Sequence, residues 1–135
     1  MSAEPTPAKS FAGKNVLVTG AARGLGLEIA RQFARSGASL HLFDLHADLL
    51  TQAGRELATH GVRVATWRVD VRQRAEVEQA VAAVEAQAPI DILINNAGIA
   101  HETAFLKIDE REWREILDVN LTGLFFVAQA VTRAM

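Results

Sequence analysis

Apolar residues follow two different patterns in turn along this chain. Short runs rich in Val, Ile and Leu occupy residues 15–19 (NVLVT), 38–44 (ASLHLFD) and 92–94 (ILI), and they are typical of strands buried in a sheet. We expect the first and the third run to be covered on both faces. Residues 62–70 (VRVATWRVD) alternate instead, which predicts a half-exposed strand at the edge of the sheet.

Segments with apolar residues every three or four positions separate these strands and predict helices. One follows Gly24 and ends near Gly37, a second ends near Gly61, and a third covers residues 72–87 before Pro89. The apolar positions that should face the sheet are Leu25, Ile29, Ala30, Phe33 and Ala34, then Leu50, Ala53 and Leu57, then Val77, Val81 and Val84.

Strands that alternate with helices predict an α/β fold with a doubly wound parallel sheet. A strand order of 3-2-1-4, with helices on both faces, places the alternating strand at the edge. Residues 109–120 and 121–135 predict two further helical segments after a loop. We expect one domain over residues 11–135 after a disordered lead over residues 1–10 (MSAEPTPAKS), which resembles neither a signal peptide nor a membrane anchor.

The composition is that of a soluble globular protein, with 50% hydrophobic and 22% charged residues in a chain of 135. A net charge of −2 offers no basic patch for nucleic acid, and no apolar stretch predicts a membrane span. Without cysteine the chain forms no disulfide, thiolate zinc site or cysteine nucleophile. The four histidines lack metal-binding spacing, and the pattern as a whole favours the cytoplasm.

Three glycines stand between the first strand and the first helix. Gly20, Gly24 and Gly26 would let the backbone approach a phosphate at the helix N-terminus, or they would only form a tight turn against a packed helix. Asp44 ends the second strand about 20 residues further on, where a carboxylate accepts hydrogen bonds from ribose hydroxyls. The alternative role of Asp44 is to cap the next helix. Together, the glycines and the acid predict a dinucleotide site.

Five short motifs strengthen that prediction: TGAARGLG (19–26), FD (43–44), VDV (69–71), NNAG (95–98) and DVNLTGLF (118–125). Together they resemble the short-chain dehydrogenase/reductase family over nearly everything after residue 12. The resemblance implies a Rossmann-like fold and a nicotinamide cofactor. The residues that it assigns to the cofactor are Gly20, Arg23, Gly24, Leu25, Gly26, Asp44, Asp70, Val71, Asn95, Ala97 and Gly98.

Several of these residues also have a structural alternative. Asp70 would cap a helix, whereas Asn95 and Asn96 would satisfy backbone groups at a strand end. Asp44 also favours NAD over NADP, because a carboxylate about 4 Å from the 2′-phosphate would repel each of its charges by roughly 4 kcal/mol at an effective dielectric of 20. Arg23 would counter this repulsion if it paired with that phosphate.

The resemblance also implies catalytic groups, namely a serine, a tyrosine, a lysine and an asparagine that exchange protons as hydride moves. Asn120 matches the asparagine, and its alternative is a polar residue at a kink between two helices. The chain has no tyrosine, and its serines and lysines stand in other segments. We therefore expect the chain to represent the cofactor-binding half of the family, inactive alone, with His101 and Glu102 as an exposed loop pair.

The leading interpretation is an NAD-dependent oxidoreductase acting on a small alcohol or carbonyl compound. The alternatives are a non-catalytic NAD-binding or regulatory module and a dimerising fragment without a ligand, while the NNAG motif argues against a methyltransferase-like fold. The strand at 91–95 and the apolar C-terminal helix lack a covering partner in this sequence. We therefore expect a homo-oligomer that forms through the C-terminal helices.

Overall fold

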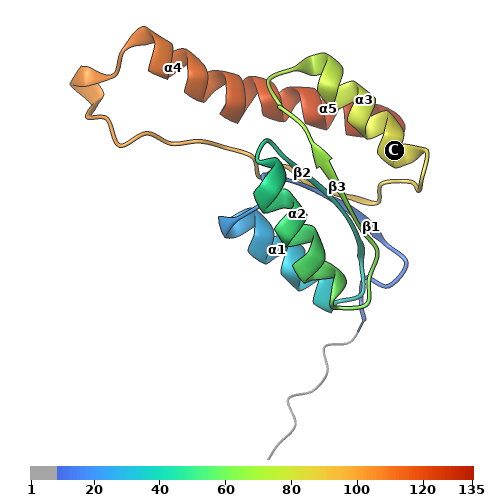
Figure 1. Ribbon diagram of the computed structural model, residues 1–135. Coiled ribbons are helices and arrows are strands. Elements are labelled where there is room, and N and C mark those ends of the chain that lie inside the picture. Colours follow the sequence, from blue (N-terminus) through green and yellow to red (C-terminus); the bar gives the residue numbers. More distant parts are fainter. Residues whose placement is uncertain (1–8) are drawn as a thin grey trace, which may run out of the picture.

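The computed structural model describes residues 9–135 and forms a four-stranded parallel sheet with helices on both faces (Figure 1). The strands are β1 (Asn15–Thr19), β2 (Ser39–Asp44), β3 (Val64–Arg68) and β4 (Ile92–Ile94), in the order β3-β2-β1-β4. The helices are α1 (Gly24–Arg35), α2 (Ala47–Ala58), α3 (Arg74–Glu85), α4 (Glu110–Leu117) and α5 (Leu124–Ala134). The predicted α/β class and the 3-2-1-4 strand order are confirmed.

The start of the chain is described only from Lys9 onward. The predicted disordered lead lies outside the described residues over positions 1–8. The carbonyl of Lys9 accepts a hydrogen bond from the N–H of Ala12 at 3.1 Å, which forms a turn before β1. Phe11 then packs edge to face on Phe33 of α1, with ring centroids 5.0 Å apart. This contact holds the segment before β1 against α1.

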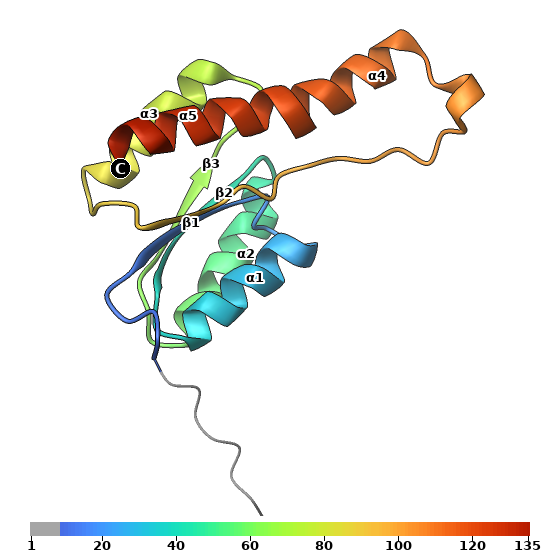
Figure 2. The ribbon, with the colours of Figure 1, turned by 180° about the vertical axis from the view of Figure 1, so that it is seen from behind.

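Alternation along the strands sends side chains into two separate cores. Val16 and Leu40 pack against α1 and α2, whereas Leu17 and Phe43 pack against α3 and α5. Figures 1 and 2 show these two pairs of helices on opposite faces of the sheet. The predicted apolar stripes of α2 and α3 are buried, as expected: Leu50, Ala53, Leu57, Val77, Val81 and Val84.

The two outer strands are less covered than the central pair. β3 lies at one edge and has only partly buried or exposed residues, as its alternation predicts. β4 lies at the other edge, pairs with β1 on one side only, and leaves Ile92, Leu93 and Ile94 partly exposed. The prediction that residues 92–94 are buried on both faces therefore holds only in part: Ile92 and Ile94 pack against one core and Leu93 against the other, but none is fully buried, because β4 pairs with β1 alone among residues 9–135.

The position of Leu25 also differs from its prediction. Its side chain is 70% exposed, whereas Gly26, Ala30 and Ala34 form the buried face of α1. Because Gly26 has no side chain, the first turn of α1 approaches the end of β1 closely. Leu25 lies beside that contact and lines the cleft described below, so it is not part of the core.

The last two helical segments form one continuous helix over Glu110–Ala134, where the sequence predicts two segments. A π-helical stretch, η2 (Asp118–Gly123), joins α4 to α5. Gly123 is buried there, and a Cβ at this position would lie 2.7 Å from Cγ2 of Val71. The widened turn and the glycine together let the helix pass close to the segment between β3 and α3.

The two ends of this long helix have different surroundings. α5 buries Val127 and Val131 against α3, while α4 projects beyond the sheet (Figure 2). By length and composition alone, the helix is long and apolar enough to cross a membrane. Only its C-terminal part packs on α3, and no residue of α4 is buried. The absence of a membrane span stays a prediction.

Candidate cofactor-binding site

A cleft of about 410 Å³ opens at the carboxyl ends of the strands. Because β2 and β4 lie on either side of β1, this cleft is at the topological switch point of the sheet. All the residues assigned to the cofactor except Asn95 line it: Gly20, Arg23, Gly24, Leu25, Gly26, Asp44, Asp70, Val71, Ala97 and Gly98. Residues at the carboxyl ends of all four strands thus line one space.

The glycine turn brings two stretches of backbone into close contact. Gly20 has φ +64°, and a Cβ at this position would lie 2.9 Å from Cα of Ala97. A Cβ on Gly26 would overlap the carbonyl oxygen of Gly20 and lie 2.5 Å from Nδ2 of Asn96. The packing alternative therefore accounts for Gly20 and Gly26. Gly24 is different, because it has φ +59° and a Cβ there would meet nothing within 4 Å.

The N-terminus of α1 has the properties of an anion site. Arg23 occupies the N-cap position, its side chain makes no capping hydrogen bond, and the first turn of the helix carries no acidic residue. The N–H groups of that turn and the positive end of the helix dipole therefore remain available to an anion. The open space beside Gly24 and this set of donors fit a pyrophosphate.

Thr19 joins the glycine turn to the segment after β4. Its side chain is fully buried, and its Oγ1 accepts hydrogen bonds from the backbone N–H of Asn96 at 3.0 Å and of Ala97 at 2.9 Å. In return, Nδ2 of Asn96 donates to the carbonyls of Thr19 at 3.1 Å and Gly20 at 3.2 Å. Asn96 thus takes the structural role that was its alternative, and it also lines the cleft.

Replacing Thr19 with valine is expected to lower the free energy of unfolding by about 1–3 kcal/mol. The new side chain has the same shape, but it leaves the N–H of Ala97 without an acceptor, at a cost of about 1–3 kcal/mol, while the N–H of Asn96 keeps its bond to the carbonyl of Ile94. Thr51→Val is the matched control, because the Thr51 hydroxyl donates only to the carbonyl of Ala47 on an exposed helical surface. Urea unfolding curves measure both changes, and equal losses in the two variants would contradict this role of Thr19.

Asp44 holds the end of β2 against the glycine turn. Its Oδ2 accepts a hydrogen bond from the backbone N–H of Ala22 at 3.0 Å, and its Oδ1 accepts one from the N–H of His46 at 3.0 Å. Nδ1 of His46 is also 3.0 Å from Oδ1, and the carboxylate side chain is 9% exposed. The N-cap of α2 is His46, so Asp44 does not take its alternative role as the cap of this helix. Its carboxylate is fixed at the cleft.

Asp70 is fixed in a similar way by a residue two positions further on. Nε of Arg72 donates to Oδ1 at 2.9 Å, its Nη2 donates to Oδ2 at 2.7 Å, and its backbone N–H donates to Oδ1 at 3.0 Å. These bonds to Arg72 hold the pKa of the Asp70 carboxyl below its usual value, against the opposing effect of burial. Gln73 is the N-cap of α3, so Asp70 does not cap this helix.

Asn95 and Asn120 do not line the cleft, and each binds backbone groups of another segment. Nδ2 of Asn95 donates to the carbonyl of Leu124 at 2.9 Å, which ties the end of β4 to α5. Oδ1 of Asn120 accepts from the N–H of Ile99, and its Nδ2 donates to the carbonyl of Ile99, both at 2.8 Å. Asn120 therefore holds the loop after NNAG in place rather than a kink of its own helix. Its catalytic role and the cofactor contact of Asn95 stay predictions.

The structure adds residues to the cleft that the sequence motifs do not indicate. Arg72, Ile99 and Val119 line it, and His46 contacts the acid at the end of β2. His46 and Arg72 each follow an aspartate by two positions, a spacing at which a carboxylate accepts from the backbone. That spacing is a usable signal in the sequence. Ile99 and Val119 carry no such signal, since only the fold brings them together.

The loop after the cleft is exposed, as predicted for His101 and Glu102. Nε2 of His101 lies 3.7 Å from Oε2 of Glu115 on α4, which makes a partly exposed pair. Among residues 9–135 there is no group of three or more His, Cys, Asp or Glu side chains placed to hold a metal ion.

Comparison with known proteins agrees with this geometry. Over 127 residues the chain is 38% identical to 5-keto-D-gluconate 5-reductase of Escherichia coli and 39% identical to gluconate 5-dehydrogenase of Gluconobacter oxydans. Each match covers 93% of this chain and 50% of the relative, so the chain spans about half the length of these relatives.

A solved short-chain type dehydrogenase/reductase from Mycobacterium marinum superposes with a TM-score of 0.89 at 35% identity, over 93% of this chain and 51% of that one. The family model described as short chain dehydrogenase matches residues 14–135. This match extends from just before β1 to the end of the chain and includes every residue of the cleft. The protein therefore belongs to the short-chain dehydrogenase family.

Proposed function

We propose that this chain is the dinucleotide-binding part of an oxidoreductase that transfers hydride between a nicotinamide cofactor and a small alcohol or carbonyl compound. The observation that carries the proposal is the cleft at the switch point, where an uncapped helix N-terminus and the Asp44 carboxylate line one space. Relatives named as reductases and dehydrogenases support the reaction class. The nicotinamide supplies hydride transfer when bound, and residues of this chain bind and orient it.

The surroundings of Asp44 support NAD as the preferred cofactor. The carboxylate is held by the backbone N–H groups of Ala22 and His46, so it has little freedom to turn away from a ribose. A 2′-phosphate about 4 Å away would be repelled by roughly 4 kcal/mol for each of its charges at an effective dielectric of 20. Arg72 lines the same cleft, but its guanidinium is already paired with Asp70.

The substrate class in this proposal is a small polar alcohol or carbonyl compound. The names of three relatives refer to 5-keto-D-gluconate, gluconate and galactitol, all of them polyhydroxylated molecules. Asn120 would contribute to the reaction by keeping the loop at Ile99 in place beside the cleft. Because the sequence contains no tyrosine, we propose that residues 1–135 alone bind the cofactor without turnover.

We also propose that the whole protein forms a homo-oligomer in the cytoplasm through its C-terminal helices. Four large apolar side chains on the long helix support this, because each is 41–62% exposed: Trp113, Leu121, Leu124 and Phe125. Apolar side chains gathered along one element often mark a protein–protein contact. Sedimentation at increasing protein concentration tests the assembly.

Calorimetric titration of the chain with NAD and with NADP, at one ionic strength, tests the cofactor proposal. We expect saturable binding of NAD and weaker binding of NADP. Glu102→Gln is the control, since it removes an exposed carboxylate outside the cleft lining and should leave both affinities unchanged. If neither dinucleotide binds, the proposed function is wrong. If NADP binds as tightly as NAD, only the role given to Asp44 is wrong.

A further inference from the structure

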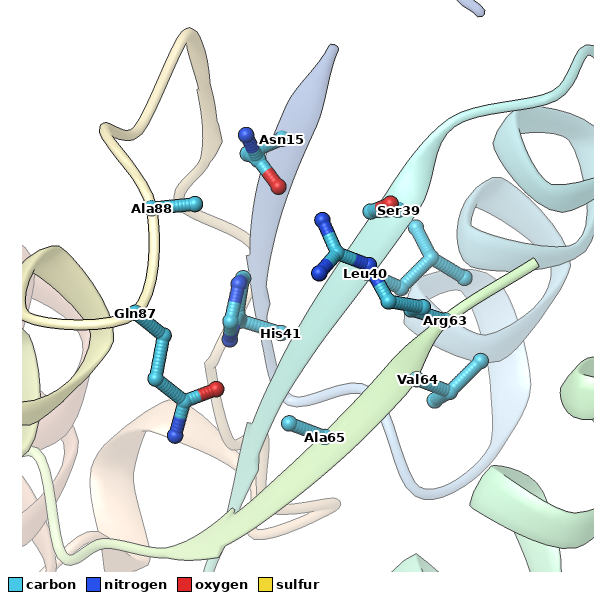
Figure 3. A pocket seen from close by; sticks show the side chains of 9 residues that line it. All are labelled: Asn15, Ser39, Leu40, His41, Arg63, Val64, Ala65, Gln87 and Ala88. Carbon is cyan, nitrogen blue, oxygen red and sulfur yellow. The ribbon is translucent and has the colours of Figure 1, made fainter. Parts of the chain in front are cut away.

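A second pocket, of about 350 Å³, lies at the opposite end of the sheet from the cofactor cleft. Its strand residues come from the amino ends of β1, β2 and β3, and its far side comes from the segment that follows α3 (Figure 3). The residue pattern explains its polarity. Asn15, Ser39, His41 and Arg63 are polar at positions on the sheet face that further along the strands carries Leu17 and Phe43.

His41 is the buried polar group of this pocket. Its side chain is only 5% exposed, and its ring makes no hydrogen bond within residues 9–135, so that Nδ1 is buried without a partner. Burial, together with the nearby positive charge of Arg63 and against the opposing charge of Glu85, lowers the pKa of His41. The imidazole is therefore neutral at neutral pH and offers one N–H donor.

The other polar groups of the pocket are also donors. Figure 3 shows the guanidinium of Arg63 reaching across β2 toward Asn15 and His41, with Gln87 on the opposite side. Arg63 forms no ion pair with any residue in the part of the chain that the structure describes. No Asp or Glu is among the described residues that line the pocket. A positive charge and several N–H donors thus converge with no carboxylate in the lining, and the nearby carboxylate of Glu85 accepts a hydrogen bond from the backbone N–H of Ile90.

We propose that this pocket binds a small organic monocarboxylate between Arg63 and His41. A guanidinium pairs with a carboxylate through two parallel hydrogen bonds, and the imidazole and amide N–H groups provide further donors. Arg63 is the single full positive charge in the lining, which matches a monoanion better than a dianionic phosphate. The volume of the pocket is at the small end of the range for ligand pockets. The small side chains of Ala65 and Ala88 leave room for a short apolar chain on the carboxylate.

Proton NMR of the full chain, titrated with sodium butyrate at constant ionic strength, tests this proposal. The variant His41→Gln assigns the imidazole signal, because that signal disappears from its spectrum. We expect a saturable shift of the His41 signal with butyrate. Arg63→Gln should weaken the apparent affinity at least tenfold, whereas Arg55→Gln removes an exposed arginine on α2 and should leave it unchanged.

Inorganic phosphate serves as the second probe in the same titration. A weaker shift with phosphate than with butyrate supports the monocarboxylate. Saturation with phosphate alone would overturn that assignment. If the response to butyrate survives in Arg63→Gln, with the amide spectrum otherwise unchanged, the proposal that Arg63 and His41 form the binding site is wrong. The absence of any saturable shift would show that water alone occupies this pocket. None of these outcomes depends on the proposed cofactor, because the two pockets share no lining residue.

Discussion

Replacing Gly26 with alanine is expected to lower the free energy of unfolding by more than about 3 kcal/mol or to prevent folding. The added Cβ would overlap the carbonyl oxygen of Gly20 and lie 2.8 Å from its carbonyl carbon. These atoms are backbone at the end of β1, so no side chain can rotate to make room. Overpacking against a flexible side chain costs about 1–3 kcal/mol, and a rigid backbone costs more.

Variants of two other glycines test whether the loss of stability comes from the close contact at Gly26 or from replacing any glycine. Gly24→Ala and Gly61→Ala each place a Cβ where nothing lies within 4 Å, at φ +59° and +77°. We expect the free energy of unfolding of each variant to fall by only about 1–2 kcal/mol, which is the cost of placing a residue with a Cβ in a left-handed backbone conformation. Thermal and urea unfolding of the three variants measure the difference. A Gly26→Ala protein as stable as Gly61→Ala would show that the turn relaxes and that the packing described here is wrong.

Replacing Asp44 with serine is expected to reduce the preference for NAD over NADP by tenfold or more. The change removes a carboxylate whose repulsion of a 2′-phosphate is roughly 4 kcal/mol per charge at 4 Å and an effective dielectric of 20, and a tenfold change needs only about 1.4 kcal/mol of it. Asp44→Asn should act in the same direction, since it removes the charge and keeps an oxygen that accepts from Ala22.

The matched control for this experiment is Asp48→Ser. Asp48 is an exposed acid in the first turn of α2, so its removal changes the net charge by the same amount without touching the carboxylate at the cleft. We expect the ratio of the two affinities to stay the same in this variant when calorimetry is done at constant salt. An equal change in Asp44→Ser and Asp48→Ser would attribute the preference to net charge, and no change in either would remove Asp44 from cofactor selection.

The fold class was predictable because its signals are local. Buried parallel strands appear as short runs of Val, Ile and Leu, and the helices between them carry apolar residues at helical spacing. The alternation over 62–70 also placed β3 at an edge, because a strand with one neighbour buries fewer of its side chains. The predicted strand order also placed residues 92–94 at the other edge, and the structure confirms it. Their apolar run alone overstated their burial, because a run of this kind does not show how many strands lie beside it.

The candidate site was predictable in its parts and less so in its contacts. The glycines and Asp44 are recognisable from spacing, since each requirement is set by a turn or a strand end near it in the chain. The hydrogen bond between Asp44 and Ala22 cannot be recognised from spacing. The same holds for the bonds that the segment after β4 donates to the hydroxyl of Thr19. The outward position of Leu25 likewise depends on how closely Gly26 approaches β1.

By itself, then, the sequence determined the order and type of the elements, the glycine turn and the acid that follows it. Tertiary structure alone decided which distant residues meet: Thr19 with Asn96, Asn120 with Ile99, and His41 with Arg63 in the lining of one pocket. The physical reason is the distance along the chain. Propensity and periodicity act over one or two turns of chain, whereas these residues come together when β2 pairs with β3, β4 pairs with β1 and the long helix packs on α3.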